Sequence, residues 1–276
     1  MRNYSLSYLT ASSLTPPQAV AVAAQAGYSH VGLRLWPSMP GGPFQDLVGD
    51  RALMRETVAR LHDTGLAVFD VEVIRMGENF DAATCMPFLE AAAALKARAV
   101  LVVGDDTDMA RLARSYARLC ELALPFGLTV DLEFLPWTAI RDANSALGIL
   151  DAAGRPSNAG ILVDALHMAR SVSTPADLAA LPRSCLHYAQ ICDGPGSGTF
   201  TREQMIHTAV SERLLPGEGG IDLRAIFGAL PPGLPVSIEI PHHIRLPQLG
   251  ALEWARQALV ASRAVLKPRN GDTLRA

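Results

Sequence analysis

The sequence predicts an α/β fold, namely a (β/α)8 TIM barrel in a single domain. Short apolar runs alternate with longer alanine-rich or amphipathic stretches along the whole chain, as expected for repeated β-then-α units. Eight such units can be placed within the 276 residues, a length that suits one barrel. No segment changes in composition as an interdomain linker would. We therefore assign residues 1–266 to the barrel and residues 267–276 to a polar C-terminal tail.

The first half of the chain supplies four strand–helix units. Pro16–Ala26 follows Thr15, a favourable N-cap residue, and stops at Gly27, so this alanine-rich stretch is expected to be helical. Ala99–Val103 is entirely apolar, as buried parallel strands tend to be. The remaining strands expected here are Tyr4–Leu9, His30–Leu35 and Ala67–Ile74, and the remaining helices are Arg51–Thr64, Phe88–Leu95 and Met109–Leu124.

The second half repeats the pattern. Its last strand, Val236–Ile240, is followed by a closing helix over Gln248–Val265. The segment between the seventh and eighth strands is longer than the others and contains two helical pieces. The other strands expected are Thr129–Phe134, Ala159–Asp164 and Leu186–Cys192, and the other helices are Arg141–Ala152, Ala176–Leu181, Glu203–Val210 and Leu223–Leu230.

The competing fold is a doubly wound open sheet, which has the same alternation of strands and helices. Such a sheet normally carries a glycine-rich fingerprint directly after its first strand. Here the first strand is followed by Thr10-Ala11-Ser12-Ser13-Leu14, which contains no glycine. The barrel is therefore the favoured prediction.

Composition excludes several functional classes. The formal net charge is −3 and there is no run of Lys and Arg, so nucleic-acid binding is not expected. No apolar run is long enough to span a bilayer, and the N-terminus lacks the apolar region of a signal peptide. The four cysteines form no close CxxC pair, which favours free thiols over a thiolate zinc site. We expect a cytoplasmic protein without nucleic-acid or membrane partners.

Four polar groups stand at or near the ends of apolar runs in the second half of the chain. They are Glu133, Asp164, Gln190 and Glu239. Active sites of these barrels lie at the carboxyl ends of the strands, where all four groups are expected. Buried carboxylates are costly unless they are paired, and a shared cation would offset that cost. Ligation by oxygen alone suits Mg²⁺ or Mn²⁺.

Each of these groups also has an ordinary structural interpretation. A single Asp or Glu after an apolar run is commonly a helix N-cap or a solvated loop charge, and Gln190 alone would be a satisfied polar group. The repetition at four consecutive strand ends favours a metal site over coincidence. His167 follows three residues after Asp164 and is a candidate base, because its unperturbed pKa lies near neutral pH. A hydrogen bond to a rim carboxylate is the alternative role for His167.

The ordered set of motifs resembles a known family. Val163-Asp164-Ala165-Leu166-His167 has a D-x-x-H pattern after the sixth strand, and Leu215–Asp222 contains a G-x-G-x-I-D turn. Together with Glu133, Gln190 and Glu239, these motifs are similar to those of the xylose isomerase-like TIM barrels, also called the sugar phosphate isomerase/epimerase group. The resemblance covers nearly the whole chain in order and spacing.

The resemblance implies a divalent metal held by Glu133, Asp164, Gln190 and Glu239. Mn²⁺ or Mg²⁺ is the first expectation, with Zn²⁺ or Co²⁺ as alternatives. It also implies an isomerase or epimerase that acts on a small sugar or hydroxycarbonyl acid through a metal-stabilised enediolate, with Glu133 and Glu239 moving the proton. The partner implied is a small polyhydroxy substrate, and barrels of this group often form homodimers.

Two alternatives to an isomerase stay open. One is a metal-dependent lyase, a dehydratase of a cyclic hydroxyketone such as 3-dehydroshikimate or an inosose, which begins with the same proton abstraction. The other is a sugar-binding barrel without catalysis. Relatives resembling hydroxypyruvate isomerases and dehydroshikimate dehydratases have Gln where Gln190 stands. Ketose 3-epimerases carry an Arg shortly after the third ligand, whereas here no Arg occurs before Arg202, which argues against that subgroup.

Several further residues are candidates for contacts with substrate. Arg34 and Arg75 close the second and third strands, where either could pair with a carboxylate or phosphate. Glu72 lies among apolar neighbours in the third strand, and a structural pair with Arg34 is its alternative role. Trp137 could wall the pocket, although aromatic packing explains it equally. His242 follows Glu239 by three residues and is the last candidate, with a solvated loop as its alternative.

Overall fold

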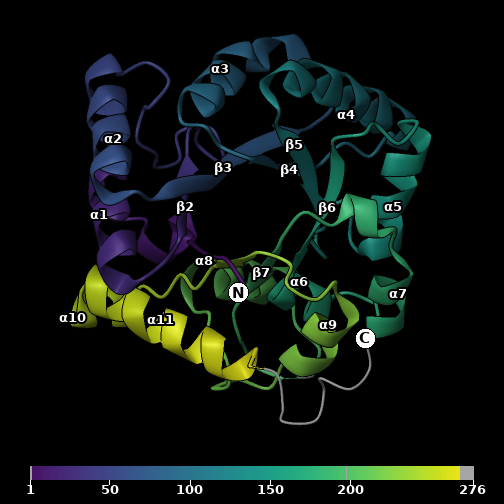
Figure 1. The fold of residues 1–276 in the computed structure, drawn as a ribbon. Helices are drawn as coiled ribbons and strands as arrows, with labels where there is room; N and C mark the ends of the chain where they lie inside the picture. The colour runs from purple at the N-terminus through teal and green to yellow at the C-terminus, as the bar shows by residue number, and fades with distance from the viewer. Residues whose placement is uncertain (1, 197, 268–276) are drawn as a thin grey trace.

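The chain forms a closed barrel of eight parallel strands in the order β1 to β8, seen in Figure 1. The coordinates are a computed structural model and describe residues 2–196 and 198–267. The barrel closes between β1 and β8, where Ser5 lies opposite Ser237. The strands are β1 Tyr4–Leu6, β2 His30–Arg34, β3 Ala67–Met76, β4 Ala99–Gly104, β5 Thr129–Glu133, β6 Ala159–Asp164, β7 Ala189–Ile191 and β8 Val236–Ile238. The prediction of a single-domain TIM barrel is confirmed.

Helices surround the barrel on its outside (Figure 1). The helix predicted after Thr15 is present: Thr15 and Gln18 form a capping box at its start, and Gly27 ends it in the left-handed conformation at φ 89°. The α-helices are α1 Pro16–Ala26, α2 Arg51–Thr64, α3 Met86–Ala94, α4 Met109–Ala123, α5 Ala143–Ala152, α6 Ala165–Arg170, α7 Pro175–Ala180, α8 Arg202–Ser211, α9 Leu223–Ala229, α10 Arg245–Leu249 and α11 Ala251–Val265.

Several element boundaries differ from the sequence prediction, and two of these differences have identifiable reasons. The first strand ends early, because Tyr8–Ala11 turns into a 3-10 helix. There the Thr10 hydroxyl donates to the carbonyl of Ile238 and accepts from the N–H of Ile240, which ties the turn to the end of β8. The closing helix is divided at Gly250, whose φ of 78° separates α10 from α11.

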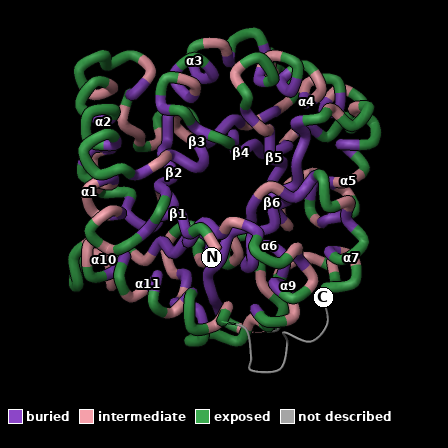
Figure 2. The backbone as a smooth tube through the Cα atoms, in the orientation of Figure 1, coloured by how far each residue is buried: buried purple, intermediate pink, exposed green. Residues whose placement is uncertain are grey.

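Alternation along the strands creates two apolar cores. Outward-facing strand residues pack with the helices in a large outer core, whereas a small inner cluster, including Leu101, Leu162 and Tyr188, fills part of the barrel. In Figure 2 the strands form a continuous buried layer beneath mostly exposed helices. The inward positions near the carboxyl end of β5 to β8 are polar, and this is where the predicted site residues lie.

Among the described residues, no helix is both long and apolar enough to cross a membrane. Of the tail predicted at 267–276, residues 268–276 lie outside the described residues.

Candidate metal centre

The four predicted ligands lie at the carboxyl ends of consecutive strands. Glu133 ends β5, Asp164 ends β6, Gln190 lies at the centre of β7, and Glu239 directly follows β8. Asp164 lies opposite Gln190 in the pairing of β6 with β7. All four side chains are buried, with Asp164 and Gln190 completely so. The structure therefore places these polar groups on one rim of the barrel, inside its mouth.

A guanidinium that the sequence analysis did not single out joins two of these carboxylates. Arg213 is 1% exposed, and its Nη1 lies 2.6 Å from Oδ2 of Asp164. Its Nη2 lies 2.8 Å from Oε2 of Glu239. Burial alone would lower the pKa of Arg213, but the Asp164 and Glu239 carboxylates raise that pKa above its ordinary value. A permanent positive charge is thus part of the site.

Arg213 is positioned by its neighbours on both sides. Its backbone N–H donates to the carbonyl of Pro241 at 3.0 Å, and its Nε donates to the carbonyl of Ala209 at 2.8 Å. Glu212 and Leu214, which flank it, form antiparallel bridges with His242 and Asp193. This short stretch of extended chain directs the arginine inward.

One sequence signal pointed to Arg213. It stands three residues before the Pro216-Gly217 turn that carried part of the family resemblance. Arg213 reaches Asp164 and Glu239 from farther along the chain than the loop after Gln190, in which no Arg occurs before Arg202.

Asp164 is both a helix cap and an ion-pair partner. Its Oδ1 accepts the backbone N–H groups of Leu166 and His167 at the start of α6, while Oδ2 accepts from Arg213. Burial would raise the pKa of Asp164, but Arg213, the nearby His167 and the backbone N–H of His167 outweigh burial and lower it. The carboxylate is therefore ionised, and the N-cap interpretation of this residue holds alongside its place in the site.

Glu239 accepts hydrogen bonds from three directions. Ser7 Oγ and Gln190 Nε2 donate to its Oε1 at 2.8 and 2.9 Å, and Arg213 pairs with Oε2. Burial raises the pKa of Glu239 to about 7; Arg213 opposes this rise, while the carboxylates of Glu72 and Asp164 add to it. The group is thus held in one orientation and titrates near neutral pH.

Glu133 lacks such partners. Its Oε1 is buried and has no hydrogen-bond partner within the described part of the chain. The nearest basic atom is Nε2 of His167 at 3.6 Å. Burial, followed by the charges of Glu239 and Asp164, raises the pKa of Glu133 well above its usual range. Without a cation, Glu133 therefore keeps its proton.

His167 lies against Glu133 and Asp164 with one ring face covered. Potential ligand atoms of these three residues all lie within 4.8 Å of one another. The Trp137 ring meets the His167 ring edge-to-face, with centroids 5.1 Å apart. Burial lowers the pKa of His167 to about 4; the Asp164 carboxylate opposes this shift and Arg213 adds to it. The imidazole is therefore neutral at pH 7, and Trp137 packs against it.

The donor set fits a divalent cation. Glu133, Asp164 and Glu239 bring three carboxylates, and Arg213 neutralises one of their charges. One divalent ion would neutralise the remaining two. Gln190 Oε1 and Glu133 Oε1 are buried oxygens that find no partner among the residues described, so both are free to ligate. These oxygens suit Mg²⁺ or Mn²⁺, and the neighbouring His167 nitrogen would also admit Zn²⁺ or Co²⁺.

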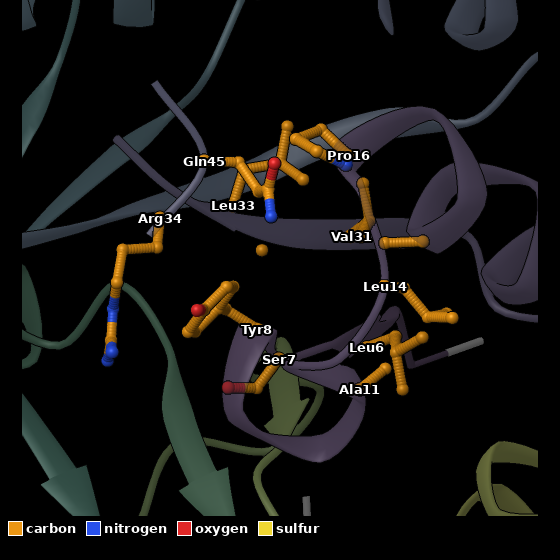
Figure 3. A pocket seen from close by; sticks show the side chains of 12 residues that line it. Leu6, Ser7, Tyr8, Ala11, Leu14, Pro16, Val31, Leu33, Arg34 and Gln45 are labelled. Carbon is orange, nitrogen blue, oxygen red and sulfur yellow. The ribbon is translucent and has the colours of Figure 1, made fainter. Parts of the chain in front are cut away.

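Arg34 and Glu72 form a pair beside this centre. Arg34 Nη2 lies 2.7 Å from Oε1 of Glu72, and both side chains are buried. The guanidinium also lies over the ring of Tyr8, 4.3 Å from its centroid. In Figure 3, Arg34 points away from the small apolar pocket behind Tyr8, which is lined by residues such as Leu6 and Leu33. The alternative role given to Arg34, a structural pair with Glu72, is present in the fold.

Arg75 and His242 lie farther from the four ligands. Arg75 pairs with Asp105 and donates through Nε to the carbonyl of Ser38, so its known partners belong to the loops that follow β4 and β2. His242 packs edge-to-face on Trp254 and accepts the N–H of Arg245 through Nδ1. Neither residue has a partner among the four predicted ligands in these contacts.

A second polar layer lies deeper in the barrel. Asp70 is completely buried, and neither of its carboxylate oxygens has a partner among residues 2–196 and 198–267. Burial, then the charges of Glu72, Glu239 and Asp131, raises the pKa of Asp70 well above its usual range. The hydroxyls of Ser5, Ser237 and Tyr188 are likewise buried without a partner in the described chain. Within the described residues, no arginine pairs with Asp70 as Arg213 pairs with Asp164.

Solved structures share this fold at low sequence identity. The IOLI protein, solved with a bound zinc atom, is 19% identical, with a TM-score of 0.75 over 96% of this chain and 98% of that one. D-allulose 3-epimerase from Methylomonas sp. is 17% identical, with a TM-score of 0.71 over 96% and 98%. The probable 3-DHS dehydratase AsbF from Bacillus anthracis is 15% identical, with a TM-score of 0.72 over 95% and 99%. At these identities the likeness concerns the fold alone.

Sequence comparison supplies the family. No curated protein matches the chain closely enough to be counted as a relative. The family model described as Xylose isomerase-like TIM barrel matches residues 20–265, which include all four strand-end groups and Arg213. The chain therefore belongs to the xylose isomerase-like TIM barrel family, as its motifs predict.

Proposed function

We propose that the chain is a divalent-metal-dependent isomerase or epimerase of a small sugar or hydroxycarbonyl acid. The main support is the charge at the rim: three buried carboxylates face one buried guanidinium, and two buried oxygens, on Glu133 and Gln190, have no partner in the described chain. Buried oxygens without partners are costly. A cation at this place removes that cost and completes the charge balance.

The bound metal would supply a Lewis acid that polarises the carbonyl of the substrate. Glu133, Asp164, Gln190 and Glu239 would hold it, with His167 available to replace one oxygen. Arg213 keeps Asp164 ionised and fixes the direction of Glu239. The chain's own contribution is thus a set of oxygens whose orientation is defined before substrate enters.

Glu239 is the proposed base for removal of the proton next to the carbonyl. Its carboxylate is held by Ser7, Gln190 and Arg213, so little reorientation is needed. Its pKa of about 7 in the metal-free chain would be lowered by a bound cation, so the loaded site would hold Glu239 as the ionised carboxylate that a base requires. His167 is a weaker candidate, since burial lowers its pKa to about 4.

Glu133 is the proposed partner acid. It comes from β5, three strands away from the end of β8. Its raised pKa keeps a proton on it in the metal-free chain, and that proton would be displaced on cation binding, so in the loaded site Glu133 first accepts a proton from substrate or water. In an isomerase it then returns this proton to the neighbouring carbon or oxygen, and in the second candidate, a lyase, it delivers the proton to a departing hydroxyl.

Exchange of substrate hydrogen with solvent tests the step that both candidates share. The chain is stripped with EDTA, reloaded with Mn²⁺ or Mg²⁺, and incubated in D2O with ketoses, hydroxypyruvate, inososes and 3-dehydroshikimate. We expect deuterium to enter one substrate at the carbon next to its carbonyl. A rearranged product identifies an isomerase, whereas ultraviolet absorbance of a conjugated product identifies a lyase.

Two isosteric variants and a control connect this activity to the site. Glu239→Gln should abolish exchange while leaving the circular dichroism spectrum unchanged. Glu133→Gln should also lower the number of protons released on metal binding, measured by calorimetry in buffers of different ionisation enthalpy. Glu90→Gln, which changes an exposed glutamate on α3, should behave like the wild type. Full exchange activity and unaltered metal binding in Glu239→Gln would refute the proposal.

A further inference from the structure

Three of the seven histidines gather at one place on the rim, outside the barrel mouth. His207 belongs to the last turns of α8, and His242 and His243 lie in the loop after β8. Glu212, one residue before Arg213, lies between two of these rings. The side chains of His207, Glu212 and His243 are 56%, 43% and 53% exposed, so water and ions reach all three.

The carboxylate of Glu212 has one imidazole nitrogen beside each oxygen. Nε2 of His207 is 3.2 Å from Oε2, and Nε2 of His243 is 3.9 Å from Oε1. Two ligands of one tetrahedral zinc ion lie roughly 3.3–3.5 Å apart. The first spacing already suits a shared ion, whereas the three potential ligand atoms do not all lie within 4.8 Å of one another, so the exposed rings of His207 and His243 have to turn toward each other when an ion binds.

The orientation of the His243 ring supports a cation site more strongly than the two distances do. Its Nδ1 lies 2.9 Å from the carbonyl of Ser211, and a carbonyl only accepts hydrogen bonds, so Nδ1 carries the proton. In the neutral ring Nε2 then carries a lone pair, and this lone pair faces a carboxylate. Two electron-rich atoms facing each other favour a cation between them. Metal-binding histidines are oriented in the same way, by an N–H donated to a backbone carbonyl.

The backbone holds the three side chains in place. The N–H of His243 also donates to the carbonyl of Ser211, at 3.0 Å, and Glu212 forms an antiparallel bridge with His242. The N–H of Glu212 donates to the carbonyl of Thr208 and ends α8. The end of α8 and the loop after β8 are therefore already joined before any ion binds, which limits the ordering that binding requires.

We propose that His207, Glu212 and His243 form a second metal site, specific for Zn²⁺ and similar transition-metal ions. Two imidazole nitrogens and one carboxylate oxygen suit Zn²⁺, Co²⁺, Ni²⁺ or Cu²⁺, in contrast to the oxygen-rich centre inside the barrel. Water completes the coordination on the exposed side. Because Glu212 and Arg213 are successive residues, the ion would fasten the extended stretch that directs Arg213 inward. This inference does not depend on the proposed function.

Zinc titration of the EDTA-stripped full chain tests the site. The Cε1–H signals of the imidazoles are followed by NMR, and affinity is measured by competition with a chromophoric chelator. In the Glu133→Gln background, which weakens the inner centre, we expect one Zn²⁺ to bind and to shift the signals of His207 and His243. Either His207→Ala or His243→Ala should weaken this binding about tenfold or more. Mg²⁺ in excess should not compete.

The matched control is His62→Ala, which removes an exposed histidine that also has a carboxylate nearby, that of Asp63 at 3.8 Å, but no second ring. This variant should bind Zn²⁺ like its parent. If Glu133→Gln fails to fold, the zinc stoichiometry of the wild type is compared with that of the histidine variants and should fall by one ion. Equal zinc affinity and stoichiometry with and without His207 and His243 would overturn the proposal.

Discussion

Asp164 and Asp70 are both completely buried in the barrel interior, yet their pKa values are shifted in opposite directions. At the rim, Asp164 accepts two backbone N–H groups and the Arg213 guanidinium, and its pKa is lowered despite burial. In the layer beneath, burial and three neighbouring carboxylates raise the pKa of Asp70. Neither oxygen of Asp70 has a partner in the chain as described. Partners, and not burial, decide which aspartate is ionised.

The rim around Asp164 stabilises negative charge, whereas the deeper layer around Asp70 does not. The rim contains a guanidinium, helix N–H groups and oxygens free to ligate, so negative charge is stabilised there. In the deeper layer, both oxygens of Asp70 and the hydroxyls of Ser5 and Ser237 are buried without a hydrogen-bond partner among the described residues. A cation is therefore expected at the rim, and a neutral carboxyl beneath it.

Of the substitutions that test this difference between the layers, removal of Arg213 should have the largest effect on the unfolding free energy. Arg213→Met leaves Asp164 and Glu239 buried without their counter-charge, which should cost about 3–5 kcal/mol of unfolding free energy. Urea unfolding of the EDTA-stripped protein measures this cost. Arg213→Lys, which keeps the charge, should lose less. A methionine variant as stable as the wild type would show that the guanidinium does not hold the rim carboxylates.

Replacement of Asp by Asn at these two positions should change the unfolding free energy in opposite directions at pH 7. Asp164→Asn removes the charged acceptor of Arg213 and should destabilise the fold by about 2–3 kcal/mol. Asp70→Asn should stabilise the metal-free protein by about 1–3 kcal/mol, because the native chain must keep a proton on Asp70 that the unfolded chain releases. Urea unfolding of the matched pair tests this. Destabilisation of similar size in both variants would remove the distinction between the layers.

Acidification should reduce the effect of Asp70→Asn to less than about 0.5 kcal/mol near pH 4. A raised pKa means that the stability contributed by Asp70 is fully present below the unfolded pKa and is lost as pH rises through the folded pKa. Asp164, whose pKa is lowered, behaves in reverse: its contribution is present above the unfolded pKa and is lost as pH falls through the folded pKa. Unfolding of the wild type and Asp70→Asn across pH 4 to 7 measures the difference. A difference in unfolding free energy between the two proteins that stays constant from pH 4 to 7 would contradict the protonated state of Asp70.

Residues close to a strand end were the ones that sequence reasoning located well. Glu133 and Asp164 end their strands, because an apolar run followed by a polar group marks where a buried strand leaves the barrel. The pairing of Arg34 with Glu72 was foreseen as one of two roles, since both residues occupy neighbouring strands. Assignments of this kind need only the periodicity of strands and the parallel order of the barrel.

Residues that act from loops were not located. Arg213 reaches Asp164 across 49 positions of sequence, and Ser7 reaches Glu239 across 232. The end of the first strand was also misplaced, because tertiary hydrogen bonds of Thr10 to the end of β8 turn the chain away from β1. No local periodicity reports such contacts.

The amino-acid sequence by itself determined the alternation of strands and helices, the barrel that follows from it, and the placing of acidic groups at the strand ends, because these depend on local patterns of apolar and polar residues. Only the tertiary structure decided which of those groups are charged. Arg213 folds back between Asp164 and Glu239, while neither oxygen of Asp70 has a partner among the residues that the structure describes. The charge of a buried carboxyl depends on what lies within a few ångströms, and those neighbours come from distant parts of the chain.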